Sequence, residues 1–194
     1  LVNGIQINTD KKILEDFQKS AGFDYTKDQK RSIREIFADI SSGRVMDRLL
    51  SGDVGFGKTE VAMNAMLAVI LDGYQAIFVC PTTLLATQHY HSMQKRFSEF
   101  GISIAKLDGK TPAKEKTHIK KGLESGEIKL VIGTHSLLEI KTNNLALVII
   151  DEEHKFGVKQ KEKLKHLRED VHIFSMSATP ILRTLNLALS KLKG

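Results

Sequence analysis

The chain has 194 residues and 41% hydrophobic content, enough for one domain with a substantial core and too little for two domains of ordinary size. Charged residues make up 27%, close to the globular average, which argues against wholesale disorder. The net charge of +6 is consistent with plain solubility or with attraction to a polyanion, and on charge alone solubility is slightly favoured. The single cysteine, Cys80, excludes an internal disulfide and is typical of a reducing cytoplasm, and no apolar run approaches the roughly 18 residues of a membrane span.

The first 22 residues are polar and irregular, with one weakly amphipathic stretch, KKILEDFQKSA. We interpret residues 1–22 as an N-terminal lead-in to one domain over residues 23–194. The apolar spacing over residues 28–40 is helical, and the run Ser41-Ser42-Gly43 ends that predicted helix. Because the chain begins without a methionine, we expect it to be a piece of a larger protein.

From residue 48 onward, short β-rich runs alternate with stretches of helical length. The predicted strands are RLLS (48–51), AIFVC (76–80), ISIAKL (102–107), KLVIG (129–133), LALVII (145–150) and HIFSMS (172–177). The predicted helices are 58–71, 83–100, 113–124, 158–168 and 182–192. This alternation predicts an α/β fold with a central, mostly parallel sheet and helices on both faces. In such sheets ligands bind at the carboxyl ends of the strands, so polar residues directly after strand runs are candidates for function.

The segment GDVGFGKT fits the pattern G-x-x-x-x-G-K-[ST] and lies between a predicted strand and a predicted helix, the context that the pattern requires. Its backbone N–H groups can wrap phosphates, helped by the helix N-terminus. Lys58 would reach the β- and γ-phosphates, and the Thr59 hydroxyl would bind Mg²⁺. The alternative, a glycine-rich turn with a chance lysine, is expected on the order of once in a hundred chains of this length. The candidate cofactor-binding residues here are Gly52, Asp53, Val54, Gly55, Phe56, Gly57, Lys58, Thr59 and Glu60.

The run LALVIIDEEH delivers acidic residues at the end of a predicted buried strand. Asp151 is placed to hold the Mg²⁺ bound by Thr59, and Glu152 could orient and deprotonate an attacking water, which a hydrolase needs and a kinase does not. Alternatively, these acidic residues could simply cap the N-terminus of the next predicted helix. Taken alone, that interpretation has about even odds, but the phosphate loop upstream makes it unlikely. A metal site made of the four consecutive residues 151–154 is disfavoured, because consecutive side chains do not converge on one ion. The other histidines show no ligand spacing, and His89 and His91 point to different faces of one predicted helix.

Other strand ends also carry small polar residues. In MSATP, Ser177 and Thr179 could couple the nucleotide site to a second ligand. The segments PTTLLATQHY and GTHSLL suit contacts to the sugar-phosphate backbone of DNA. The candidate DNA-binding residues are Thr82, Thr83, Gly133, Thr134 and His135. Helix N-capping by these threonines is the alternative, and both roles can hold together.

The segment FDYTKDQ precedes the first predicted strand. The Gln29 amide could pair with N6 and N7 of adenine, the geometry by which glutamine contacts this base elsewhere. Phe23 could pack on the same ring, and a place in the ordinary core is at least as consistent with its sequence.

Together these motifs resemble the first motor domain of superfamily 2 helicases and translocases, over nearly the whole chain from about Phe23 onward. That family carries a glutamine that contacts adenine, a phosphate loop, threonine-rich strand-end loops, a DEx[HQ] box and an SAT segment in this order. The resemblance implies a RecA-like domain that binds ATP and Mg²⁺ and supplies one half of an ATP-hydrolase site. A second motor domain, which this sequence lacks, would normally supply an arginine finger that raises the rate by about 10³–10⁵-fold.

Within the superfamily, the chain resembles the branch that couples transcription to repair. That resemblance implies a translocase on double-stranded DNA that pushes stalled RNA polymerase and recruits an excision-repair protein through domains outside this sequence. The competing branch, branch-migrating helicases of stalled forks, usually carries Ser at Phe56 and Gln at Glu153. A self-contained P-loop kinase and a nucleic-acid-binding module with a vestigial nucleotide site are further alternatives. We expect this chain alone to bind nucleotide weakly and to hydrolyse it slowly if at all.

Overall fold

A single parallel sheet organises the part of the chain that the computed structural model describes, which is residues 3–51, 55–151, 157–164 and 167–177. Its six strands are ordered β1-β6-β5-β2-β4-β3, and every neighbouring pair is parallel. The strands are β1 (Asp47–Ser51), β2 (Gln75–Val79), β3 (Ala105–Leu107), β4 (Leu130–Gly133), β5 (Leu145–Asp151) and β6 (His172–Ser177). The helices are α1 (Lys12–Lys19), α2 (Lys27–Ser41), α3 (Gly55–Leu71), α4 (Thr83–Ser98), α5 (Ala113–Ser125), η1 (His135–Glu139) and α6 (Val158–Lys163). The α/β fold expected from the sequence is confirmed.

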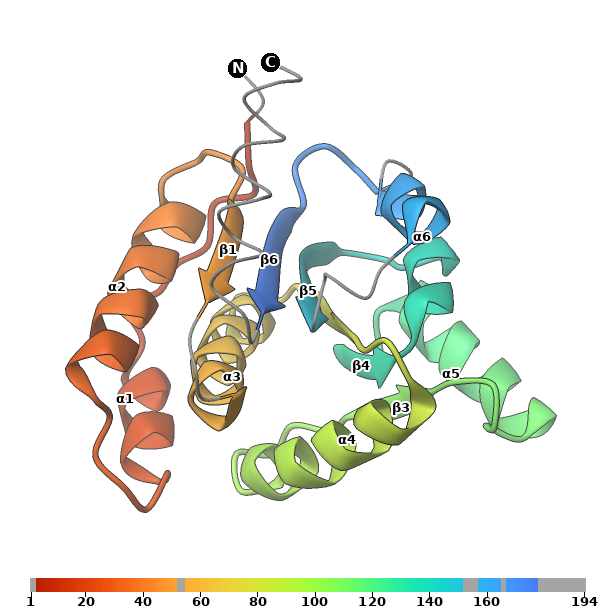
Figure 1. The fold of residues 1–194 in the computed structure, drawn as a ribbon, viewed down its shortest axis with the longest axis horizontal. Coiled ribbons are helices and arrows are strands. Elements are labelled where there is room, and N and C mark those ends of the chain that lie inside the picture. The colour runs from red at the N-terminus through yellow and green to blue at the C-terminus, as the bar shows by residue number, and fades with distance from the viewer. Residues whose placement is uncertain (1–2, 52–54, 152–156, 165–166, 178–194) are drawn as a thin grey trace.

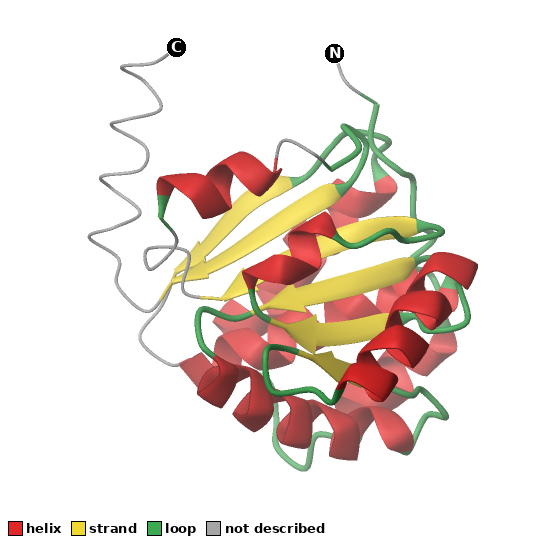
Figure 2. Cartoon of the chain, turned by 90° about the vertical axis from the view of Figure 1, so that its right-hand side faces the viewer, coloured by secondary structure: helices red, strands yellow, loops and turns green. Residues whose placement is uncertain are grey.

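Helices cover both faces of the sheet, as Figures 1 and 2 show. The larger core lies between one face and α1, α2, α3 and α4, and it includes Phe78 of β2 and Phe174 of β6. The second core lies on the opposite face, where Ile119 and Leu123 of α5 and Leu137 of η1 pack on β2, β4 and β5. Covering both faces explains why β5 is buried at every position and shows no polar alternation. In the same way residues 61–69 of α3, apolar nearly all round, are all buried.

Several element boundaries differ from the sequence-based prediction. The predicted strand 102–107 is shortened to β3, because the chain is still turning after α4: Gly101 takes a positive φ of 72°, and the Ile102 N–H donates to the Phe97 carbonyl. The single-turn helix η1 was not predicted. Helix α6 ends at Lys163 rather than residue 168, and the predicted helix 182–192 lies outside the described residues.

The N-terminal segment is not irregular, as the sequence suggested, but forms α1 and contributes to the larger core. Ile5, Ile7, Leu14 and Phe17 are buried, and the Phe17 ring stacks on Phe97 of α4 with centroids 5.4 Å apart. Leu14 and Phe17 are three residues apart on one helical face, and two such residues are too weak a pattern to indicate a buried helix from sequence alone. The domain boundary at residues 22 and 23 stays a prediction.

A buried histidine at the start of β6 connects this N-terminal segment to the sheet by hydrogen bonds. In β6, His172 Nδ1 accepts the Met46 N–H at 2.9 Å, so Nε2 carries the proton and donates to the Ile5 carbonyl at 2.6 Å. Burial lowers the pKa of His172 below its usual value, while the Ile5 carbonyl and the nearby charges of Asp170 and Asp39 act in the opposite direction.

This lowered pKa makes stability depend on pH. The unfolded chain binds a proton at this histidine below about pH 6.5 while the folded chain keeps it neutral, so the free energy of unfolding should fall as pH drops below that value. Urea unfolding between about pH 7.5 and pH 5 measures this slope. In His172→Gln the slope should flatten, whereas His118→Gln, on the exposed face of α5, should keep it. Equal slopes in both variants would contradict the assignment.

Candidate nucleotide site

The glycine-rich segment has the strand–loop–helix context that its pattern requires. Strand β1 ends at Ser51 and α3 begins at Gly55, so Lys58 and Thr59 lie near the N-terminus of a buried helix. Lys58 is 7% exposed and Thr59 is 8% exposed. Backbone N–H groups at a helix N-terminus, together with the helix dipole, favour a bound anion. The predicted residues Gly52, Asp53 and Val54 lie outside the described residues, as does the side chain of Phe56.

Asp151 lines the same cavity as Lys58 and Thr59. It is the last residue of β5, which is separated from β1 only by β6, and parallel strands bring their carboxyl ends to the same edge of the sheet. All three side chains line a cavity of about 760 Å³ that is also bounded by α4 and by the segment between α1 and α2. Glu152, the next predicted catalytic residue, lies outside the described residues.

These residues suit a bound magnesium ion. Mg²⁺ takes oxygen ligands, usually one or two from the protein together with substrate phosphates and water. The Thr59 hydroxyl and the Asp151 carboxylate are oxygen donors on the wall of one cavity, and each residue is only 8% exposed. The sequence-based pairing of Thr59 with Asp151 is therefore compatible with the geometry.

His89 contacts Asp151, which sequence analysis missed. From the middle of α4, its Nε2 atom lies 2.9 Å from Asp151 Oδ2, and its ring packs on Phe78 with centroids 5.1 Å apart. His91 is exposed, so the two histidines do face different ways as predicted. Because histidine and aspartate are 62 residues apart in the sequence, no local spacing could have indicated the contact.

Gln29 reaches the phosphate-loop helix from α2. Its side chain completes a capping box: Oε1 accepts the Thr26 N–H at 2.9 Å, and the Thr26 hydroxyl accepts the Gln29 N–H at 3.1 Å. Its Nε2 atom donates to the Gly57 carbonyl at 3.3 Å. An amide has a second N–H and a second lone pair, so these bonds leave room for the proposed contact to adenine. Phe23, 39% exposed, lines the cavity rather than lying in the core.

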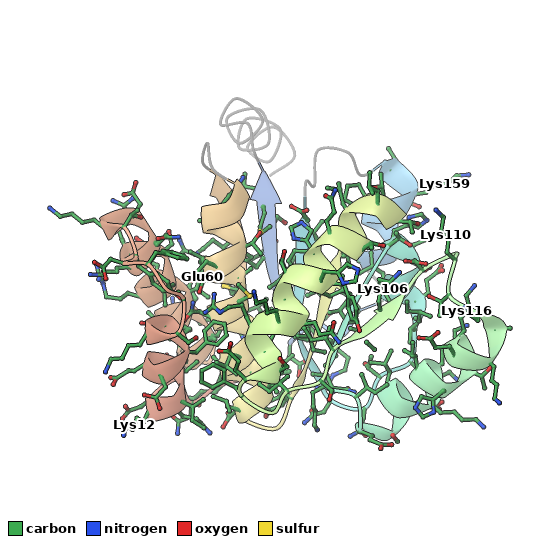
Figure 3. All side chains as sticks on the ribbon, turned by 90° about the horizontal axis from the view of Figure 1, so that it is seen from below. Lys12, Glu60, Lys106, Lys110, Lys116 and Lys159 are labelled. Carbon is green, nitrogen blue, oxygen red and sulfur yellow. The ribbon has the colours of Figure 1, made fainter. Side chains whose placement is uncertain are left out.

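The Glu60 carboxylate takes part in a buried polar network and is not directed only toward the cavity. Glu60, labelled in Figure 3, is 1% exposed. Its carboxylate accepts hydrogen bonds from the Tyr25 hydroxyl and from Arg96 of α4. Arg96 also donates to the Phe17 carbonyl at 3.0 Å and covers the Phe17 ring at 4.3 Å. Burial and the Glu60 carboxylate raise the pKa of Tyr25, which keeps its hydroxyl a donor. The network joins α3, α4 and the N-terminal segment beside the phosphate loop.

Removing the cation from this network should destabilise the fold. In Arg96→Ala the nearly buried Glu60 carboxylate loses its counter-charge, which we expect to lower the free energy of unfolding by about 3 kcal/mol. The control is Arg31→Ala, whose ion pair with Asp28 is exposed and should contribute little. Urea unfolding of both variants gives the comparison, and similar small losses would show that the network does not stabilise the domain.

The candidate DNA-binding residues lie at the ends of neighbouring strands β2 and β4. Thr82 caps α4, its hydroxyl accepting the Leu85 N–H at 3.2 Å, and Thr83 begins that helix. Thr134 is the N-cap residue of η1, but its side chain makes no capping hydrogen bond, so the N-capping role predicted for this side chain is wrong. His135, the first residue of η1, is half-buried. A Cβ at Gly133 would lie 1.9 Å from the Leu107 carbonyl oxygen, so only glycine fits between β4 and β3. For Ser177 the side chain, and for Thr179 the whole residue, lie outside the described residues.

These features define a class of protein. A parallel α/β sheet, a glycine-rich segment leading into a buried helix, and an acidic residue ending a nearby strand are the parts of a RecA-like nucleotide-binding domain. The family model described as DEAD/DEAH box helicase matches residues 26–188, and the chain belongs to that family. Among the described residues, no helix has the length and hydrophobicity needed to cross a bilayer.

Two curated relatives and one solved structure illustrate what this chain is similar to. The chain is 55% identical over 194 residues to the transcription-repair-coupling factor of Helicobacter pylori strain J99, covering 100% of this chain and 19% of that protein. It is 58% identical over 181 residues to the same factor of Helicobacter pylori strain 26695, covering 93% and 18%. A structure of RecG bound to a three-way DNA junction matches with a TM-score of 0.83 and 44% identity, covering 96% of this chain and 25% of that one. The chain thus spans about a fifth of the length of these curated relatives.

Proposed function

We propose that this domain is the ATP-binding half of a double-stranded DNA translocase of the transcription-repair coupling type. The observation that carries the proposal is the convergence of Lys58, Thr59 and Asp151 on one cavity at the carboxyl edge of the sheet. Membership of the helicase family and the identity of 55–58% to coupling factors support the assignment.

The residues divide the work of hydrolysis among them. Lys58 and the N-terminus of α3 bind the phosphates, Thr59 and Asp151 hold Mg²⁺, and Gln29 with Phe23 contacts adenine. When bound, Mg²⁺ neutralises charge on the β- and γ-phosphate oxygens. Glu152 orients the attacking water and accepts its proton, so that the γ-phosphoryl group goes to water.

The other domains of the proposed translocase lie outside this domain. A second motor domain closes the site with an arginine finger, and other modules bind RNA polymerase and an excision-repair protein in the cytoplasm. On this domain the DNA backbone contacts the strand-end loops, where Thr82, Thr83, Gly133, Thr134 and His135 lie. Ser177 and Thr179 couple the two ligands.

A branch-migrating fork helicase is the second candidate. The observation in its favour is the RecG structure, whose match at 44% identity covers 96% of this chain. The identity of 55–58% to the two Helicobacter pylori coupling factors, together with Phe56 and Glu153, favours the first proposal.

The fate of the γ-phosphate tests hydrolysis against phosphoryl transfer. With ATP, Mg²⁺ and duplex DNA, a longer protein containing this domain should release inorganic phosphate at the rate at which ADP appears. Transfer of the phosphate to a small-molecule acceptor would instead identify a P-loop kinase and overturn the proposal.

A further inference from the structure

Three side chains with different ligand atoms converge beside the nucleotide site. The thiol sulfur of Cys80, a ring nitrogen of His89 and a carboxylate oxygen of Asp151 all lie within 4.8 Å of one another. We propose that these three residues form a binding site for a thiophilic divalent cation such as Zn²⁺.

The topology of the sheet creates this cluster. Strands β2 and β5 are parallel neighbours with Val79 opposite Ile150, so the next residues, Cys80 and Asp151, leave the sheet side by side. Helix α4 then returns over this edge and brings His89 to within 2.9 Å of the Asp151 carboxylate. Asp151 ends β5, His89 lies in α4, and Cys80 directly follows β2, where its N–H donates to the Gly133 carbonyl at 2.7 Å.

The geometry is close to that of a zinc site. With zinc–sulfur distances of about 2.3 Å and zinc–nitrogen or zinc–oxygen distances of about 2.0 Å, tetrahedral ligand atoms lie about 3.3–3.6 Å apart. The observed separations, 2.9 Å between His89 and Asp151 and at most 4.8 Å within the cluster, bracket that range. Side-chain movements that shift the ligand atoms by about an ångström would bring them to these tetrahedral separations. A water molecule would provide the fourth ligand.

An ion can reach the site, and the ligand set selects which ion. His89 and Asp151 both line the 760 Å³ cavity, while Cys80 is fully buried behind them. Sulfur and imidazole nitrogen suit Zn²⁺ and Co²⁺, whereas Mg²⁺ prefers oxygen ligands alone. When the cation binds, the Cys80 thiol loses its proton to solvent and the His89 ring moves its proton from Nε2 to Nδ1. The metal–nitrogen bond then replaces the His89–Asp151 hydrogen bond.

Sharing Asp151 has a functional consequence, which rests on the proposed function. If Asp151 holds the Mg²⁺ that accompanies ATP, a thiophilic cation held by Cys80 and His89 takes that carboxylate away. Zn²⁺ would then inhibit ATP hydrolysis by competing with Mg²⁺ for a single ligand.

Cobalt binding to this chain, without nucleotide, tests the site independently of any ATPase activity. Titration with Co²⁺ should produce a thiolate-to-cobalt charge-transfer absorption together with the visible bands of tetrahedral cobalt, and Zn²⁺ should displace it. Cys80→Ser should abolish the charge-transfer band, and both Cys80→Ser and His89→Ala should weaken Zn²⁺ binding by about tenfold or more. His91→Ala, an exposed histidine two residues along α4, is the matched control and should bind like the parent chain.

Two results would overturn the site: a cobalt spectrum without the charge-transfer band, or equal Zn²⁺ affinity in Cys80→Ser and the parent chain. Thermal unfolding checks that each variant is folded, and if His89→Ala is not, Cys80→Ser decides alone. In a longer protein with ATPase activity, Cys80→Ser should raise the half-inhibiting Zn²⁺ concentration by about tenfold or more at unchanged basal rate. Equal inhibition of both proteins would contradict the competition. If no ATPase activity exists at all, the proposed function fails while the cobalt result still decides the metal site.

Discussion

Replacing Lys58 by alanine is expected to reduce ATP hydrolysis by about 10²–10³-fold in a longer protein that contains this domain. The ammonium group is the cation at the start of α3 that would bind the β- and γ-phosphates, and the residue is 7% exposed on the cavity wall. Its loss leaves the developing charge on the transferred group without a fixed partner. Steady-state phosphate release measures the rate.

The same substitution in this chain alone tests ground-state binding. A charge-assisted hydrogen bond contributes about 1.5–3 kcal/mol, so ATP affinity should fall by about tenfold or more. Lys12→Ala, at an exposed position of α1 far from the cavity, is the control and should change neither rate nor affinity. Unaltered nucleotide binding in Lys58→Ala would favour the rival hypothesis of a nucleic-acid-binding module with a vestigial nucleotide site.

Replacing Glu152 by glutamine should separate binding from hydrolysis. Glutamine keeps the size of the side chain but cannot accept the proton of the attacking water, so the hydrolysis rate should fall by about 10²–10⁴-fold. ATP affinity should stay nearly unchanged, because Lys58, Thr59 and Asp151 remain. Equilibrium binding and single-turnover hydrolysis, measured on the same longer protein, give the two quantities.

The neighbouring acid provides the control for this prediction. Glu153→Gln makes the same chemical change one residue further along the chain and should leave the rate within a small factor of the parent. Equal losses in the two variants would show that the segment needs its total negative charge rather than a base at position 152. A loss of affinity without a loss of single-turnover rate would place Glu152 in nucleotide binding.

The sheet could be predicted from sequence because its strands are local features. A short run such as LALVII, apolar at every position, is typical of a strand covered on both faces, and β5 is buried throughout. The phosphate-loop helix could be located for the same reason, since the motif is contiguous and α3 begins inside it. The N-terminal helix was missed because its burial depends on Phe97 and other residues of α4, far along the chain.

The polar contacts around the site could not be predicted, because they join distant segments. Glu60 was expected to bind nucleotide, yet its carboxylate is bound by Tyr25 and Arg96, which lie 35 and 36 residues away. His89 was expected only to face away from His91, and its partner Asp151 is 62 residues away. Such pairs follow from strand order and helix packing, which local patterns do not encode.

The most direct test of the central claim is the rate of ATP hydrolysis, with and without duplex DNA, for this chain alone and for a longer protein that adds the second motor domain. If this domain is one half of a DNA-dependent ATPase, the longer protein should hydrolyse ATP faster with DNA, and the chain alone should be slower by about 10³-fold or more and insensitive to DNA. Rapid, DNA-stimulated turnover by this chain alone, or a longer protein that hydrolyses no ATP under either condition, would contradict the account.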